Sequence, residues 1–246
     1  AYGYDGMIYA AEQGADMISC SWGGLGNYSQ SSAEVIAYAT GLGSIVLCAA
    51  GNDNVNGNFY PCDYPGAVSV ASVNLGDTKA SYSNFNPAVD VSAPGGGWEG
   101  GILSSVPDNG YEFWSGTSMA TPMVAGLTAL IKSYHPDWTN EQLLTQLFYT
   151  ADDIDSINPG YENMLGYGRI NAFRALSETG DTVPQELELQ VTEMVITDEN
   201  NNSILEHGED VNLDFTIRNC NHFLGCENVT FALITDDEAI QVVSGP

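Results

Sequence analysis

The chain has 246 residues; 43% are hydrophobic, and 32 acidic residues face only 5 basic ones, giving a formal net charge of -27. This length suits one sizeable core and a smaller module, and the apolar fraction indicates a globular protein. No apolar run approaches the roughly 20 residues of a membrane-spanning helix. The negative charge repels nucleic acid and anionic membranes. We therefore expect no nucleic acid partner, no membrane span and an extracellular setting.

Short apolar strands alternate with helices over residues 1–178. Strands are predicted at ADMISCS (15–21) and SIVLCAA (44–50), with a helix over SSAEVIAYATGLG (31–43) between them. A strand–helix–strand unit within about 30 residues implies a parallel sheet and an α/β fold. Thr139 and Gln142 have the spacing of a capping box. Further strands are predicted at AVSVASV, VDVSA and ILSSV, and helices at 117–134, 139–150 and 168–177.

The pattern changes near residue 180. A short polar linker (179–186) precedes residues 187–246, where the hydrophobic period falls from 3.6 to 2. The alternating apolar residues are Leu187, Leu189, Val191, Val211, Leu213, Phe215, Ile217, Val229, Phe231 and Leu233. Such alternation predicts half-buried antiparallel strands of an immunoglobulin-like β-sandwich. Because about 60 residues are short for a sandwich of around 100, we expect this module to be partial.

A serine stands among small residues in WSGTSMATPMVAG, at the start of a predicted helix. Gly116 allows close approach of backbone to Ser118, and Pro122 suits the first turn of the helix. Free N–H groups and the helix dipole favour an anionic oxygen at this place. For a serine taken alone, an ordinary helix cap is the simpler interpretation. The choice between nucleophile and cap depends on the surrounding sequence.

WSGTSMATPMVAGLTALI closely resembles the nucleophile segment of the subtilisin-like serine proteases, the subtilases, and similar segments follow in the family's order over most of residues 1–178. The resemblance implies a parallel-sheet, three-layer domain represented by its C-terminal two-thirds, with Ser118 as nucleophile. VLCAAGNDN resembles the segment that carries the family's oxyanion asparagine, here Asn52. GADMISCSWGG resembles the strand that lines the substrate groove. The implied substrate-binding residues are Ser21, Trp22, Gly23, Gly24, Ala49, Ala50, Gly51 and Thr117.

The chemistry of acyl transfer accounts for these residue types. It needs a nucleophile and a base within about 3 Å of each other, and donors aimed at the developing oxyanion. Asn52 follows a buried strand and a glycine, so its amide can project toward the first turn of the Ser118 helix. The Ser118 backbone N–H would be the second donor. Taken alone, Asn52 in GNDN is equally well interpreted as a turn residue.

The three histidines do not supply the base. His135 lies 17 residues after Ser118, roughly 25 Å along a helix at 1.5 Å per residue. His207 and His222 lie in the second module, where a solvated role is the simpler interpretation. Subtilases carry their triad in the order Asp, His, Ser, so the resemblance places both partners on a segment upstream of this chain. Asp16 and Asp90 match structural segments, and neither is assigned to the triad.

These observations predict a secreted serine endopeptidase that cleaves peptide bonds of proteins or peptides through a Ser118 acyl-enzyme. The chain alone would be inactive, no cofactor would be needed for the chemistry, and the complete protein would be a monomer. The alternative is a non-catalytic binding or adhesion protein on a degenerate subtilase fold. Ser118 and Asn52 favour the enzyme, because a decayed site would free both residues to change.

The segment DENNNSILEHGE follows the spacing of a calcium-binding loop in part. Two features depart from that template: Ser203 replaces the usual glycine, and the flanking residues indicate strands. A polar hairpin rich in Asn is the alternative interpretation. Calcium would act here as a structural ion. The candidate ligands are Asp198, Asn200, Asn202, Ile204, Glu206 and Glu209.

The five cysteines lack the spacing of a metal site. Cys220 and Cys226 flank a five-residue loop and could close a small disulfide in a secreted protein. Cys20 and Cys48 each lie in an apolar run, which predicts buried thiols. Cys62 lies in a predicted loop. The odd count implies at least one free thiol.

Overall fold

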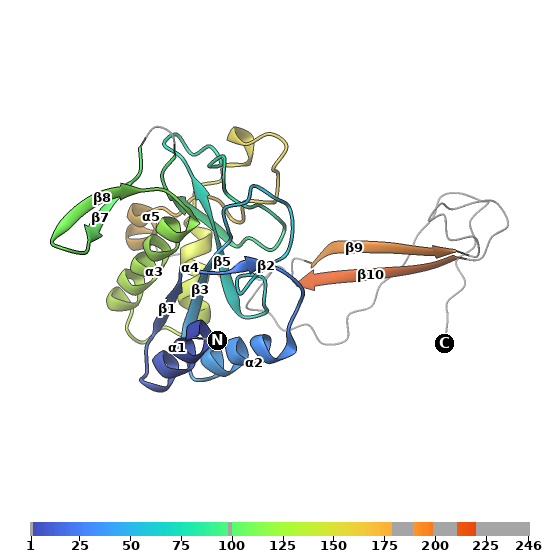
Figure 1. The fold of residues 1–246 in the computed structure, drawn as a ribbon, viewed down its shortest axis with the longest axis horizontal. Coiled ribbons are helices and arrows are strands. Elements are labelled where there is room, and N and C mark those ends of the chain that lie inside the picture. Colours follow the sequence, from blue (N-terminus) through green and yellow to red (C-terminus); the bar gives the residue numbers. More distant parts are fainter. Residues whose placement is uncertain (1, 98–99, 179–188, 199–210, 220–246) are drawn as a thin grey trace. The chain divides into compact units, whose positions relative to one another are not determined.

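The computed structural model describes residues 2–97, 100–178, 189–198 and 211–219 (Figure 1). Contacts within the chain divide it into two units, residues 1–184 and 185–246. Among the described helices, none combines the length and the apolar character needed to cross a bilayer.

The first unit alternates strands and helices, as the sequence predicts. Its elements in chain order are α1 (Tyr2–Glu12), β1 (Met17–Cys20), β2 (Gly24–Leu25), α2 (Gln30–Gly41), β3 (Ile45–Ala49), β4 (Phe59–Tyr60), β5 (Ala67–Val73), β6 (Val91–Pro94), β7 (Ile102–Val106), β8 (Gly110–Trp114), α3 (Thr117–Tyr134), α4 (Asn140–Tyr149), the 3-10 turn η1 (Asp155–Ile157) and α5 (Ala172–Ser177).

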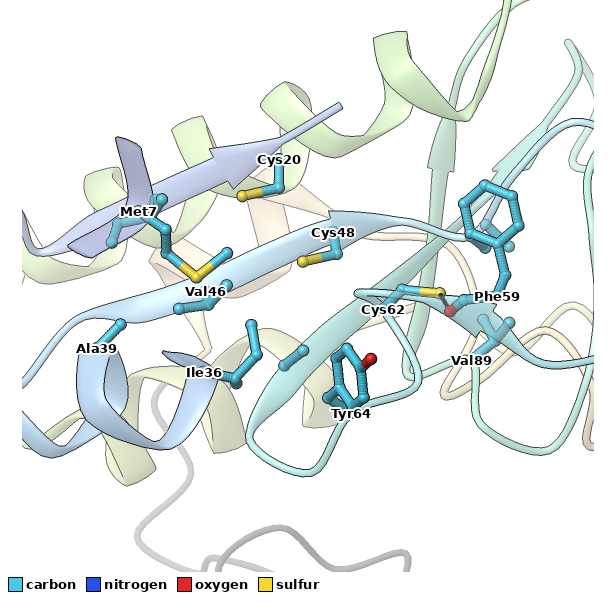
Figure 2. Close-up of a cluster of buried hydrophobic side chains, with 14 of the residues drawn as sticks. Met7, Cys20, Ile36, Ala39, Val46, Cys48, Phe59, Cys62, Tyr64 and Val89 are labelled. Atoms are coloured by element: carbon cyan, nitrogen blue, oxygen red, sulfur yellow. Dashed lines mark hydrogen bonds between the residues drawn. The ribbon is translucent and has the colours of Figure 1, made fainter. Parts of the chain in front are cut away.

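A parallel sheet of four strands, in the order β1-β3-β5-β6, forms the centre of this unit. Successive side chains of a strand point to opposite faces. On one face, Val46 and Cys48 of β3 pack with Met7 of α1 and Ile36 and Ala39 of α2 in a common hydrophobic cluster (Figure 2). The two helices thus cover this face of the sheet.

The other face of the sheet is covered by α3, which contacts all four strands. Its buried residues Val124, Leu127 and Ile131 recur at the spacing of one helix face. Leu47 of β3, next to Val46 and Cys48 in sequence, is fully buried and lies outside the cluster of the first face. A sheet between two helical layers confirms the predicted α/β, subtilisin-like fold.

Of the three helices predicted after residue 116, two begin where the sequence predicts and the third begins later. α3 spans the predicted residues 117–134, and α4 begins with the predicted capping box, in which Thr139 Oγ1 accepts from Gln142 N at 3.3 Å. The predicted helix at 168–177 begins four residues late, at Ala172. Arg169 bridges to Ser92 and Asp152 in extended conformation, so helix formation is delayed until Asn171 caps α5.

The predicted strand ILSSV is formed, but it does not pair with the other predicted strands. As β7 it pairs antiparallel with β8 in a two-stranded sheet, outside the parallel sheet. Asp108 and Asn109 form the turn at φ values of 63° and 60°, the conformation that a tight hairpin demands. The hairpin runs directly into α3 and thereby leads the chain to Ser118.

Gly166 packs against the backbone of the residue preceding β6. Its φ is +72°, and a Cβ built on it would lie 2.2 Å from the Asp90 carbonyl oxygen. We expect Gly166→Ala to lower the free energy of unfolding by about 1–3 kcal/mol more than strain in the left-handed region alone, because the backbone must shift. Urea unfolding of the full-length protein measures this difference.

Gly160→Ala is the matched control for that substitution. Gly160 also has positive φ, +90°, but nothing lies within 4 Å of a Cβ built there. The control therefore carries the backbone strain, about 1–2 kcal/mol, without the clash. Equal losses of stability in the two variants would show that the contact of Gly166 with Asp90 is relieved without cost.

The second unit contains two described strands, β9 (Leu189–Asp198) and β10 (Val211–Asn219), which pair antiparallel with Val211 opposite Asp198. The predicted alternation at residues 211–217 falls within β10. The β-sandwich stays a prediction, since residues 199–210 and 220–246 lie outside the described residues. The same holds for the calcium loop beyond Asp198, for His207 and His222, and for Cys220 and Cys226.

Candidate active site

Ser118 is the second residue of α3, where the first turn leaves backbone N–H groups without helical partners. Its hydroxyl donates to the Ser21 carbonyl oxygen at 3.3 Å, and the Ser21 hydroxyl donates to the Ser118 carbonyl oxygen at 2.8 Å. These two bonds join the end of β1 to the start of α3. The predicted nucleophile and the predicted groove residue therefore lie together, although 97 positions separate them in the sequence.

The side-chain amide of Asn52 is hydrogen-bonded through its oxygen, Oδ1, and not through its nitrogen, Nδ2, among the described residues. Its Oδ1 accepts from Thr117 N at 2.9 Å and from Thr117 Oγ1 at 3.0 Å. The Thr117 hydroxyl also accepts from Gly51 N at 3.2 Å. Because the oxygen faces α3, the Nδ2 group is left as a free donor among the described residues.

Asn52 Nδ2 and Ser118 N, two donors without a hydrogen-bond partner among the described residues, both lie near Gly116. A methyl group placed on Gly116 would lie 3.6 Å from Asn52 Nδ2 and 3.6 Å from Ser118 N. The absence of a side chain at Gly116 keeps this point open. Two N–H groups directed at one point in front of a serine can stabilise a negatively charged oxygen that develops there.

An open pocket adjoins this point and is lined by Ser21, Trp114, Ser115, Ser118 and Met119. Ser21, Trp22, Gly23 and Gly24 are all exposed and lead from β1 into β2. A Cβ on Gly23 would lie 2.6 Å from the Tyr60 carbonyl oxygen and 2.3 Å from the Phe59 ring, so the chain can pass this closely only without a side chain. Trp22 stands edge-on to Tyr4, with ring centroids 5.0 Å apart.

The other predicted substrate-binding residues lie beneath this surface. Ala49, Ala50, Gly51 and Thr117 are buried. Gly51 has a φ of +102°, and a Cβ there would lie 2.3 Å from Asn84 Nδ2. Because they are buried, these residues pack beneath the surface that carries Asn52 and Ser118, whereas residues 21–24 are exposed to solvent.

The described histidine and the two acidic residues set aside in the sequence analysis are engaged in structural contacts. His135 ends α3 and stacks on Trp138, with ring centroids 3.7 Å apart. Asp16 pairs with Lys132 at 3.2 Å. Asp90 is buried, and its Oδ2 accepts from Ser69 N at 2.6 Å. Within residues 2–97 and 100–178, no histidine therefore contacts Ser118.

Cys20, Cys48 and Cys62 are buried free thiols of the first unit (Figure 2). This confirms the prediction of buried thiols for Cys20 and Cys48. Burial raises the pKa of the Cys62 thiol well above its ordinary value, which disfavours the reactive thiolate. Over the described ranges, no cluster of three or more His, Cys, Asp or Glu side chains has the geometry of a metal site.

The sequence analysis missed the contacts that hold the loop carrying Asn52. Asn84 Oδ1 accepts from Asp53 N at 2.9 Å and from Val55 N at 3.2 Å, while Asn84 Nδ2 donates to the Ala50 carbonyl at 2.9 Å. Asn84 lies in the segment ASYSNF (80–85), but nothing in that segment tells which of its side chains contacts the loop that carries Asn52.

Comparisons with known proteins identify relatives of this chain. The chain is 40% identical over 173 residues to thermitase of Thermoactinomyces vulgaris, covering 70% of this chain and 58% of that protein. It is 37% identical over 177 residues to the halolysin-like extracellular serine protease Nep of Natrialba magadii, covering 72% of this chain and 31% of that protein. The chain thus spans less than two thirds of the length of either relative.

A solved structure of a protease from Pseudoalteromonas arctica matches with a TM-score of 0.65 and 34% identity, over 71% of this chain and 57% of that one. Residues 3–168 match the model of the Subtilase family, and this range contains Ser21, Asn52 and Ser118. The chain belongs to the subtilase family.

Proposed function

We propose that the chain is part of a secreted serine endopeptidase that hydrolyses peptide bonds in proteins or peptides. The observation that carries the proposal is that Asn52 Nδ2 and Ser118 N each lie 3.6 Å from the same point, a Cβ built on Gly116, next to the residue that carries the hydroxyl. In the proposed reaction, Ser118 Oγ attacks the peptide carbonyl carbon, and the carbonyl oxygen becomes an oxyanion held by these two N–H groups.

The proton of the Ser118 hydroxyl goes to a histidine on an upstream segment, where an aspartate orients it, and then to the leaving amine. The resulting ester is hydrolysed by water through the same oxyanion site. Ser21–Gly24 would bind the substrate backbone, because this exposed stretch begins at Ser21, which is hydrogen-bonded to Ser118. The chemistry needs no cofactor in this scheme.

Four further assignments belong to the same proposal. Residues 1–178 form the peptidase domain, 179–186 the linker and 187–246 a partial immunoglobulin-like module. The segment 198–209 is a candidate site for a structural calcium ion, with a polar turn as the alternative. Secretion is supported by the net charge of -27 and by the relative described as an extracellular serine protease; the complete protein acts as a monomer.

Labelling with a fluorophosphonate probe tests the proposed nucleophile. We expect the full-length protein, including its upstream segment, to be labelled at Ser118, as located by mass spectrometry. The 246-residue chain alone should remain unlabelled, because a serine without a base is an ordinary alcohol. Labelling of the chain alone at a rate similar to the full-length protein would contradict an upstream base, and failure of both to react would contradict the nucleophile.

A further inference from the structure

We infer that Lys79 is a positioning residue for the oxyanion site: its ammonium group fixes the loop of residues 50–55, here called the Asn52 loop, through the side chain of Asn54. The inference rests on the proposed function and deepens it, because it assigns a residue outside the catalytic surface to the geometry of the oxyanion donor.

The ammonium group of Lys79 uses all three of its N–H donors on neutral oxygens. Nζ lies 2.7 Å from Asn54 Oδ1, 2.9 Å from the Ser83 carbonyl oxygen and 3.1 Å from the Ala80 carbonyl oxygen. An ammonium group has three donors, so its hydrogen-bonding capacity is filled. One of the three bonds reaches the Asn52 loop, and the other two reach the segment that follows Lys79.

Two aromatic rings complete the surroundings of this cation. Nζ lies 5.0 Å from the centroid of the Phe85 ring and 4.9 Å from that of Tyr161, and these rings meet edge to face at 4.7 Å. Both distances are within the range of attraction between a cation and a ring face. The Lys79 backbone N–H also donates to Asn158 Oδ1 at 2.6 Å. Lys79 thus joins three separate parts of the first unit.

No described carboxylate pairs with Lys79, whereas the described side chains of Lys132, Arg169 and Arg174 all form ion pairs. This contrast matters in a chain with 32 acidic residues. Burial lowers the pKa of Lys79, because its charge is desolvated without a compensating negative charge. Desolvating part of a cation among dipoles alone is costly, and the three hydrogen bonds to oxygen atoms and the two ring contacts offset part of that cost.

The bond from Lys79 reaches a point in the Asn52 loop where the backbone is strained. Asn54 has a φ of +54°, a left-handed conformation that few residues other than glycine adopt. Its backbone N–H donates to the Tyr82 carbonyl at 2.9 Å, and its side chain accepts from Lys79. Asn54 is therefore tied at both its backbone and its side chain, two residues after Asn52.

The test is a double-mutant cycle in the full-length protein with a peptide substrate. We expect Lys79→Met, which keeps the length of the side chain but removes its charge, to lower kcat about tenfold with KM unchanged, a fraction of the 10²–10³-fold loss caused by removing an oxyanion donor. In an Asn52→Ala background the same substitution should have no further effect on kcat. Equal losses in both backgrounds would overturn the inference.

Lys132→Met is the matched control, because it removes a partly exposed lysine that pairs with Asp16 at the far end of α3. Asn54→Gly provides a second route: it deletes the oxygen bound to Lys79 and tolerates positive φ. It should lower kcat in the same direction, whereas Asn109→Gly, at a φ of 60° in the β7–β8 turn, should not. Unchanged kcat in Asn54→Gly would also overturn the inference.

Amide hydrogen exchange provides a readout that does not require proteolysis. In Lys79→Met we expect the Asn54 amide to exchange about tenfold faster, through local opening of the loop, with β7 and β8 unchanged. Absence of hydrolysis in the unsubstituted protein would refute the proposed function, while this measurement would still decide the role of Lys79. Unchanged exchange over residues 51–55 would refute that role.

Discussion

Ser118→Ala should reduce peptide hydrolysis by the full-length protein by about 10⁶-fold, the loss typical of deleting the nucleophile of a catalytic triad. In the proposed reaction this hydroxyl forms the acyl-enzyme, and Asn52 binds the residue that precedes Ser118 at the start of α3. The peptide should still bind with an affinity near that of the unsubstituted protein, because removing one hydroxyl leaves the exposed stretch of residues 21–24 intact. Steady-state kinetics and equilibrium binding together measure the two effects.

Ser133→Ala is the control for this substitution. Ser133 lies on the same helix, is exposed, and donates its hydroxyl to the Leu130 carbonyl at 2.8 Å. Its loss should leave hydrolysis unchanged. A Ser118→Ala protein that retained a tenth of its activity would exclude Ser118 as the nucleophile and would favour a hydrolytic site elsewhere in the protein.

Asn52→Ala should lower kcat by about 10²–10³-fold in the full-length protein while KM changes little. The reason is that, in the proposed reaction, Asn52 Nδ2 donates to an oxygen that becomes anionic only in the transition state. The anchored Oδ1, which accepts two hydrogen bonds from Thr117, shows which end of the amide faces the reaction. A peptide boronic acid, which carries a negatively charged tetrahedral centre once bound, should lose affinity in proportion to kcat.

Thr117→Val separates the donor from its anchor. It removes the hydroxyl bond to Asn52 Oδ1 at 3.0 Å but keeps the backbone bond at 2.9 Å. We expect a loss of kcat much smaller than that of Asn52→Ala. If Asn52→Ala instead raised KM and left kcat unchanged, Asn52 would bind the ground state of the substrate, and the oxyanion assignment would be wrong.

Sequence patterns predicted the fold well where one local signal decided the outcome. The capping box of Thr139 and Gln142 was sufficient to place the start of α4, and the apolar run at 44–50 was sufficient for β3. They failed at Arg169, where distant partners decided the outcome: this residue is extended because Ser92 and Asp152 pair with it. For ILSSV the deciding signal was local, because the tight turn that directly follows it makes it one strand of a hairpin.

The residues of the candidate site could be proposed from the sequence, but the contacts that hold them could not. Ser118 and Asn52 could be proposed from the sequence because they lie in segments that resemble those of a known family. The anchoring of Asn52 by Thr117, and the bond from Lys79 to Asn54, could not be proposed, because each joins residues at least 25 positions apart. Lys79 stands in the polar turn DTKAS, where a solvent-exposed lysine would look the same.

The hydrogen bonds of Thr117 have a mechanical consequence. Asn52 lies in the loop after β3, and Ser118 lies in the first turn of α3. Thr117 links the two, because it is hydrogen-bonded to Asn52 and directly precedes Ser118 in the chain. A displacement of the first turn of α3 would be transmitted to the Asn52 amide through these hydrogen bonds. Thr117 therefore couples the position of the Asn52 amide to that of Ser118, together with the contacts that Asn84 and Lys79 make with the same loop.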